Sequence, residues 1–311
     1  MYESLIKDME QIMNEMQTHL NYIKNIKPKF QIAIPSHNRP NGPFIELCKK
    51  ENLNPIIYID DIDPIEEYKK NNLQLVIGPK RTIAEKRYDM VEDLYKKGYD
   101  FIWMIDDDVH DFATKNMENK KLPLTVTQFL SSAEQFIDPK IDAYCKFNIF
   151  GLVGLHLFGA NKTYRNAKLY SVSKNKPGLI ATCFGINVKL LKENKIQFDK
   201  KCPHGCGEDI AMTADIYLKG LQGKNIYFEG FSMNDKIVSQ CWNDEKHTGS
   251  SKDIASQFVR HREAFTYLRK KYGTLIKWHQ SMGATINSGP KVIETPDWYV
   301  EEKKYKFGVN V

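Results

Sequence analysis

A run of large apolar side chains ends directly in three carboxylates at residues 101–109, which read FIWMIDDDV. The apolar part has the length and composition of a strand that is buried on both faces. In an open α/β sheet, ligands bind beyond the carboxyl ends of the strands. Neighbouring carboxylates repel one another unless a cation lies among them, and oxygen ligands suit Mg²⁺ or Mn²⁺. This segment therefore predicts a strand ending at a divalent metal that carries a phosphorylated ligand, with a solvated acidic turn as the alternative.

The composition fits one large soluble α/β unit, since 41% of the 311 residues are apolar and 12% are aromatic. The first residues lack the features of a signal peptide, and no apolar run reaches the length of a bilayer. We therefore expect a cytoplasmic protein, in the host cytoplasm if it is viral, with no membrane partner. Six scattered cysteines fit reduced thiols in that compartment. The net charge of +6 is compatible with a polyanionic partner and equally with a solvated surface.

The pattern of apolar residues divides the chain into three parts. Residues 1–28 predict an amphipathic helix that packs on the main domain or pairs with a second copy. Residues 29–250 alternate strand and helix and then become mixed, which predicts one sheet, mainly parallel, with covering helices. Residues 251–311 predict a helical, basic extension. The expected strands are 30–34, 55–59, 73–77, 101–105, 150–158, 169–172 and 179–188, and the expected helices are 42–52, 64–71, 82–97, 125–136 and 209–218.

Polar residues also follow two other expected strands. The loop 34–40 offers backbone N–H groups, the Ser36 hydroxyl and the Arg39 guanidinium to an anionic or nucleotide ligand. Asp60 and Asp61 follow the next strand, where a carboxylate accepts hydrogen bonds from a nucleobase or ribose. Asp63, directly before Pro64, predicts a helix N-cap.

Two helix starts carry charged side chains of the kind that a catalytic site needs. Arg81 lies near the start of the helix 82–97 and Arg87 about two turns into it, where a diphosphate would be well placed. Glu208 and Asp209 begin the helix 209–218 or directly precede it. They serve either as a general base or as capping residues, and the two interpretations have equal weight on local grounds.

Cys202, His204 and Cys206 form a short cluster of zinc-ligand types. Cys241 and His247 are distant partners for such a site, but no second pair stands at zinc-finger spacing. We favour reduced thiols in an acceptor-side loop over a zinc site.

These features occur in the order found in GT-A glycosyltransferases of the family 2-like kind. The order is an Ile-Pro-Ser strand end, an acidic strand end, a Gly…Arg segment, Asp106-Asp107-Asp108, Cys183-Phe184-Gly185-Ile186-Asn187 and Gly207-Glu208-Asp209. Within that fold, the chain resembles the glycosyltransferases associated with TET/JBP DNA-base oxygenases, which have a similar Ile-Pro-Ser-x-x-Arg-Pro start and Asp-Asp-Asp-Val strand end. The resemblance implies a GT-A (Rossmann-like) α/β fold with a mixed, mainly parallel sheet and helices on both faces.

The resemblance also implies roles for particular residues in an inverting transfer from a nucleotide-sugar, in the first place a UDP-sugar. Asp106 and Asp108 would hold Mn²⁺ or Mg²⁺, with His247 as a third ligand. Asp209 would be the general base, with Glu208 as its rival. The implied donor-binding residues are Pro35, Ser36, Arg39, Asp60, Asp61, Arg81, Arg87, Asp106 and Asp107.

The acceptor that the resemblance implies is a 5-hydroxymethylpyrimidine in DNA. A basic stretch in the C-terminal part is suited to track a phosphate backbone, and consists of Arg260, His261, Arg262, Arg269, Lys270 and Lys271. The same chemistry on a polysaccharide or protein acceptor is the alternative, and a non-catalytic nucleotide-sugar or nucleic-acid binding module is a second. The carboxylates at 106–108 and 208–209 argue against a pure binder, which does not need a base. The sequence leaves the sugar and the oligomeric state open.

Overall fold

The computed structural model describes residues 29–115, 121–134, 152–154, 171–173, 183–219, 225–227, 231–234, 254–279 and 283–286. The expected helix over 1–28 lies outside these residues, as do His247 and Cys241. Within the described ranges, none of the helices has both the length and the apolar character that crossing a membrane requires.

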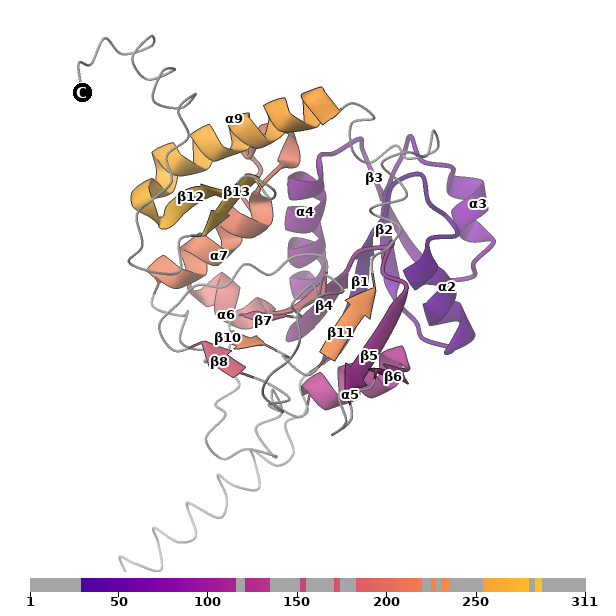
Figure 1. Ribbon diagram of the computed structural model, residues 1–311. Helices are drawn as coiled ribbons and strands as arrows, with labels where there is room; N and C mark the ends of the chain where they lie inside the picture. The colour runs from indigo at the N-terminus through magenta and orange to yellow at the C-terminus, as the bar shows by residue number, and fades with distance from the viewer. Residues whose placement is uncertain are drawn as a thin grey trace, which may run out of the picture.

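An eight-stranded sheet forms the centre of the fold, in the order β3-β2-β1-β4-β9-β7-β10-β8 (Figure 1). The four strands β1 to β4 are parallel neighbours, whereas β9 runs antiparallel to β4 and to β7. The strands are β1 (Phe30–Pro35), β2 (Ile56–Asp60), β3 (Gln74–Gly78), β4 (Phe101–Ile105), β7 (Leu152–Gly154), β8 (Ser171–Ser173), β9 (Cys183–Asn187) and β10 (Asn225–Tyr227). This confirms the mixed, mainly parallel sheet that the sequence predicts.

Two smaller sheets accompany the large one. One has the order β11-β5-β6 and consists of β5 (Asp111–Lys115), β6 (Lys121–Leu124) and β11 (Phe231–Asn234). The other is the antiparallel pair β12 (Ile276–His279) and β13 (Gly283–Ile286). The strand β5 starts three residues after Asp108, so the chain leaves the end of β4 directly for the second sheet.

Helices cover both faces of the large sheet, which explains why every residue of β4 is buried. Side chains alternate between faces along a strand, so Trp103 and Ile105 join one core cluster while Ile102 and Met104 join the other. The first cluster includes residues of α2 (Pro43–Lys50), α3 (Ile65–Lys69) and α5 (Val126–Glu134). The second includes residues of α4 (Ile83–Lys96), α6 (Val188–Glu193) and α7 (Glu208–Leu218).

The long helix α9 (Ile254–Tyr272) packs on α7 (Figure 1). Phe265 and Leu268 of α9 share a buried cluster with Ala211 and Ala214 of α7. A short helical turn η2 (Pro203–Gly205) precedes α7, and another, η4 (Gly273–Leu275), follows α9. The first part of the basic extension is therefore integrated with the helix that carries Glu208 and Asp209.

Two local expectations change in the folded chain. The first residue of α7 is Glu208, and Gly207, with φ of 81°, is its N-cap. The prediction that Asp63 caps the following helix is wrong, because Pro64 occupies the N-cap of α3. The Asp63 carboxylate instead accepts hydrogen bonds from the backbone N–H groups of Asn38 and Asp60. The Asp63 carboxylate therefore binds backbone N–H groups of two other segments and not those of the helix that follows it.

Candidate functional site

The candidate site lies at the carboxyl ends of β1, β2 and β4. Because these three strands are parallel, Ser36, Asp60 and Asp106 are brought to the same edge of the sheet. The start of α7 reaches this edge as well, through an ion pair between Glu208 and the α4 residue Arg87. The structure thus gathers residues from all five of the sequence segments that were expected to form the site.

Ser36, Arg39 and Asp107 form one buried network with Tyr68 of α3. The Ser36 hydroxyl donates to Asp107 Oδ2 at 2.5 Å and lies 2.7 Å from the Tyr68 hydroxyl. Arg39 Nη2 lies 2.8 Å from Asp107 Oδ1, and the Arg39 backbone N–H donates to Tyr68. Burial raises the pKa of Asp107, and Arg39 and Ser36 partly offset that rise. Asp107 therefore turns into the protein and fixes the shape of the loop after β1.

Asp60 is held by two cations. Arg81 Nε lies 3.0 Å from Asp60 Oδ1, and Lys86 Nζ lies 3.3 Å from Asp60 Oδ2. Lys86 also donates to the Ser36 carbonyl at 2.6 Å, and its burial lowers its pKa despite the attraction of Asp60. Asp60 is buried, and each of its carboxylate oxygens is already paired with a cation. The neighbouring Asp61 side chain is exposed.

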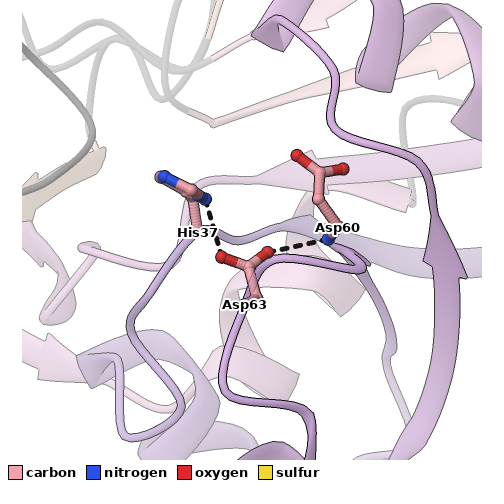
Figure 2. A group of neighbouring side chains, drawn as sticks. All are labelled: His37, Asp60 and Asp63. Carbon is pink, nitrogen blue, oxygen red and sulfur yellow. Dashed lines mark hydrogen bonds and ion pairs between the residues drawn. The ribbon is translucent and has the colours of Figure 1, made fainter.

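Figure 2 shows how Asp63 joins the loops after β1 and β2. His37 Nδ1 lies 2.6 Å from Asp63 Oδ1, and the Asp60 backbone N–H donates to Asp63 Oδ2. Burial favours a higher pKa for Asp63, but the hydrogen bonds from His37 and the backbone outweigh it and lower the pKa. The His37 side chain is 30% exposed, whereas that of Asp63 is fully buried. Asp63 therefore orients a histidine ring that faces partly outward.

Arg87 links the acidic strand end to the start of α7. Its Nη2 donates to Asp106 Oδ1 and its Nη1 to Glu208 Oε1, both at 2.6 Å. Arg87 is 4% exposed and Glu208 5% exposed. Burial raises the pKa of Glu208 to about 8, which the positive charge of Arg87 partly opposes.

Asp209 has a different environment from Glu208. Asp209 is partly exposed, and its Oδ1 accepts a hydrogen bond from the Ile210 backbone N–H at 2.8 Å. Burial of its carboxyl raises its pKa, and the charge of Arg87 partly offsets this. A carboxylate with a raised pKa, in a residue that is partly exposed, has the properties of a proton acceptor.

The surroundings of Asp108 show whether the acidic strand end fits a divalent metal. Its Oδ2 lies 3.4 Å from Arg39 Nη1, whereas its Oδ1 is buried and has no hydrogen-bond partner among the described residues. Burial, together with the charges of Asp106 and Asp107, raises the pKa of Asp108 to about 7. A buried carboxylate oxygen without a donor is stabilised by a cation, so Asp106 and Asp108 fit a divalent metal.

A second set of residues has the spacing of a metal site but not the free ligand atoms. His37, Asp60 and Asp63 offer atoms within 4.8 Å of one another, and no other such group of three occurs in the described part of the chain. Arg81 and Lys86 occupy the Asp60 carboxylate, and backbone N–H groups occupy both oxygens of Asp63. A metal bound here would have to displace these donors. The three residues are therefore better suited to orienting the His37 ring toward a ligand than to binding a metal.

The cysteine cluster before α7 is not gathered into a zinc site among the described residues. His204 pairs with Glu263 at 2.7 Å, and the Cys206 sulfur lies 3.7 Å from His261 Nδ1. Cys202 and Cys206 are free thiols, and burial raises the pKa of Cys206 to about 12. These contacts dock the segment before Glu208 on α9.

Several residues of the site carry no local signal that sequence reasoning could have used. Tyr68 and Lys86 lie on amphipathic helices, where an aromatic ring and a lysine are ordinary residues. Their partners lie 32 and 50 residues away along the chain. His37 lies two residues after the end of β1, and this position in a polar loop after a strand is the one signal by which it could have been selected.

Comparison with protein families matches residues 30–223 to a family described as TET-Associated Glycosyltransferase. The matched range includes every strand and helix that contributes to the site described above. Comparison with curated proteins gives no match.

Proposed function

The chain belongs to the TET-associated glycosyltransferase family, and from this premise we propose that it moves a sugar from a UDP-sugar to a hydroxyl of a 5-hydroxymethylpyrimidine in DNA. The observation that carries the proposal is the link from Asp106 through Arg87 to Glu208, with Asp209 beside it. It joins carboxylates suited to a metal and a donor diphosphate with carboxylates suited to a base. A module that only binds nucleotide-sugars or nucleic acid has no use for the second group.

In this proposal the loop after β1 and the end of β2 hold the donor nucleoside. Pro35, Ser36 and Arg39 contribute the loop, and Asp60 or Asp61 contributes a carboxylate. Asp107 supports this loop through Ser36 and Arg39. Arg81 stands beside Asp60 at the start of α4, close to the expected position of the diphosphate.

Asp106 and Asp108 are the residues that we propose hold Mn²⁺ or Mg²⁺. Asp108 Oδ1, which is buried and has no hydrogen-bond partner in the part of the chain that the structure describes, supports this assignment. When bound, the metal neutralises charge on the departing nucleoside diphosphate. His247 remains a predicted third ligand, since it lies outside the described residues.

The chemical step that we propose is a single displacement. Asp209, with Glu208 as the alternative, removes the proton of the acceptor hydroxyl as its oxygen forms a bond to the anomeric carbon. The bond from that carbon to the diphosphate oxygen breaks, and the electron pair leaves with the nucleoside diphosphate. Because attack and departure occur on opposite faces, the configuration at the anomeric carbon is inverted.

Transfer itself tests the proposal. The protein, Mn²⁺ and a panel of nucleotide-sugars are incubated with DNA containing hydroxymethylcytosine or hydroxymethyluracil, and the DNA is then digested and its nucleosides weighed. We expect a nucleoside heavier by one sugar residue, and we expect chelation of the metal to abolish it. Absence of such a product with every donor, alongside transfer to a saccharide or protein hydroxyl, would contradict the DNA acceptor.

Binding to DNA provides an independent test of the acceptor. Helix α9 carries basic residues, of which Arg269 donates to the Gly273 carbonyl and Lys271 pairs with Asp199, while Lys270 is exposed. We expect the association constant to fall steeply between about 50 and 200 mM salt, because phosphate contacts release counterions. Lys270→Gln is expected to reduce the slope of log K against log salt by about 1.

Lys50→Gln is the matched control, because Lys50 is an exposed lysine at the end of α2. In Figure 1, the helix α2 lies at the right of the view and α9 at the upper left. It is expected to leave the slope unchanged. Binding that does not vary with salt would favour the polysaccharide or protein acceptor and reduce the basic surface to a solubilising one.

A further inference from the structure

We propose that Arg87 is a positioning residue that holds the base-bearing end of α7 against the metal-bearing end of β4. The inference deepens the proposed function and rests on it. Arg87 lies on α4, Asp106 directly after β4, and Glu208 at the first position of α7. One planar guanidinium therefore joins three elements through two contacts of 2.6 Å each.

The position of Arg87 is itself fixed from several sides. Thr82 and Glu85 form a capping box that sets where α4 begins. The guanidinium lies over the Phe184 ring, 5.3 Å from its centroid, so strand β9 supports it from another direction. A guanidinium with two fixed amino groups matches two carboxylates, whereas a lysine offers one point charge.

The start of α7 depends on this external contact. Its N-cap is Gly207, which has a left-handed φ of 81° and provides no side-chain hydrogen bond to the helix. Glu208, the next residue, points to Arg87, and Asp209 follows it along the first turn. The Arg87–Glu208 pair thus fixes the turn from which Asp209 is presented.

The same contacts separate Arg87 from the donor diphosphate, where the sequence had placed it. Its two amino groups face carboxylates, and its side chain is 5% exposed. The Asp106 side chain is 26% exposed, so it meets Arg87 on one side and the open edge of the sheet on the other. Asp106, and not Arg87, is the member of this link that faces the donor.

Three variants separate positioning from simple charge balance. Arg87→Lys keeps the charge but reaches one carboxylate instead of two. Arg87→Met leaves Glu208 buried and unpaired, whereas Arg87→Met combined with Glu208→Gln removes that buried charge. Lys192→Met is the control, because it breaks another ion pair of α4, with Glu92, away from the site.

We expect kcat to fall about 100-fold in Arg87→Lys, the loss typical of a reacting group displaced by about 1 Å. Arg87→Met should melt several degrees lower, because an unpaired buried carboxylate is costly. The double variant should regain the melting temperature while kcat stays about 100-fold low. Recovery of kcat together with the melting temperature, or a kcat for Arg87→Lys within about twofold of wild type, would overturn the proposal.

Calorimetry of UDP with Mn²⁺ provides a readout that needs no acceptor. If Arg87 only positions α7, it makes no contact with the donor nucleotide. Kd for UDP in Arg87→Lys should then stay within about threefold of wild type, well below the tenfold change that corresponds to about 1.4 kcal/mol. A loss of tenfold or more would assign Arg87 to the diphosphate and overturn the inference. Failure of the wild-type protein to bind any nucleoside diphosphate or transfer any sugar would instead contradict the proposed function.

Discussion

Replacing Asp209 with asparagine is expected to lower kcat by about 10²–10⁴-fold while the affinity for the nucleotide-sugar stays nearly constant. The amide keeps the size of the side chain and an oxygen that accepts the hydrogen bond from the Ile210 N–H. It cannot accept the proton of the acceptor hydroxyl. Steady-state kinetics with varied donor, together with calorimetric binding of the donor nucleotide, measure the two effects separately.

Glu208→Gln is the matched comparison, because Glu208 directly precedes Asp209 and its carboxyl also has a raised pKa. The glutamine oxygen still accepts a hydrogen bond from Arg87, so we expect a smaller loss of kcat than in Asp209→Asn. A larger loss in Glu208→Gln would make Glu208 the base. An equal loss of donor affinity in Asp209→Asn would instead assign Asp209 to the donor site.

Asp108→Asn is expected to abolish the coupling between metal and nucleotide binding and to lower kcat by about 10²–10³-fold, the usual cost of removing one electrostatic contact to a transition state. In the wild-type protein, we expect Mn²⁺ to tighten UDP binding, since Asp106 and Asp108 would hold the metal and its charge would offset that of the diphosphate. In the variant, UDP titrations with and without Mn²⁺ should give nearly the same Kd.

The fold should survive this change. Three neighbouring carboxylates repel one another, and a neutral amide removes one of the charges, so the melting temperature should not fall. Glu67→Gln, at an exposed residue of α3, is the control and should keep both turnover and coupling. Normal turnover of Asp108→Asn in the presence of a chelator would contradict the assignment of a metal to this strand end.

The sequence by itself indicated the family, and its expected strands overlap seven of the eight strands of the large sheet; β10 and the strands of the two smaller sheets were not among them. Buried strands such as 101–105 consist almost wholly of large apolar residues, and their limits follow from the polar residues that end them. The predicted strand 101–105 agrees with β4, and the predicted strand 30–34 is one residue shorter than β1. The resemblance to the family rested on short motifs in a fixed order. These motifs follow parallel strands, whose carboxyl ends lie at one edge of the sheet.

Only the tertiary structure decided which charged groups face each other. The sequence placed Asp60, Arg81 and Arg87 together at the donor, but could not show that Arg81 and Lys86 neutralise Asp60. Arg87 and Glu208 are 121 residues apart in the sequence, and no local sequence pattern indicates that they form an ion pair. Asp63 was expected to follow the rule for helix caps, but backbone donors from Asn38 and Asp60 compete for its carboxylate.

The difference has a physical cause. Which apolar side chains are buried depends on their spacing along the chain, and this spacing is visible in consecutive residues of the sequence. Ion pairs and hydrogen bonds inside a site depend on distances of about 3 Å between side chains of separate elements, which the packing of α4, α7 and β4 sets. The sequence therefore indicated which edge of the sheet carries the proposed site, and the tertiary structure decided which of its carboxylates are paired inside the protein and which remain partly exposed.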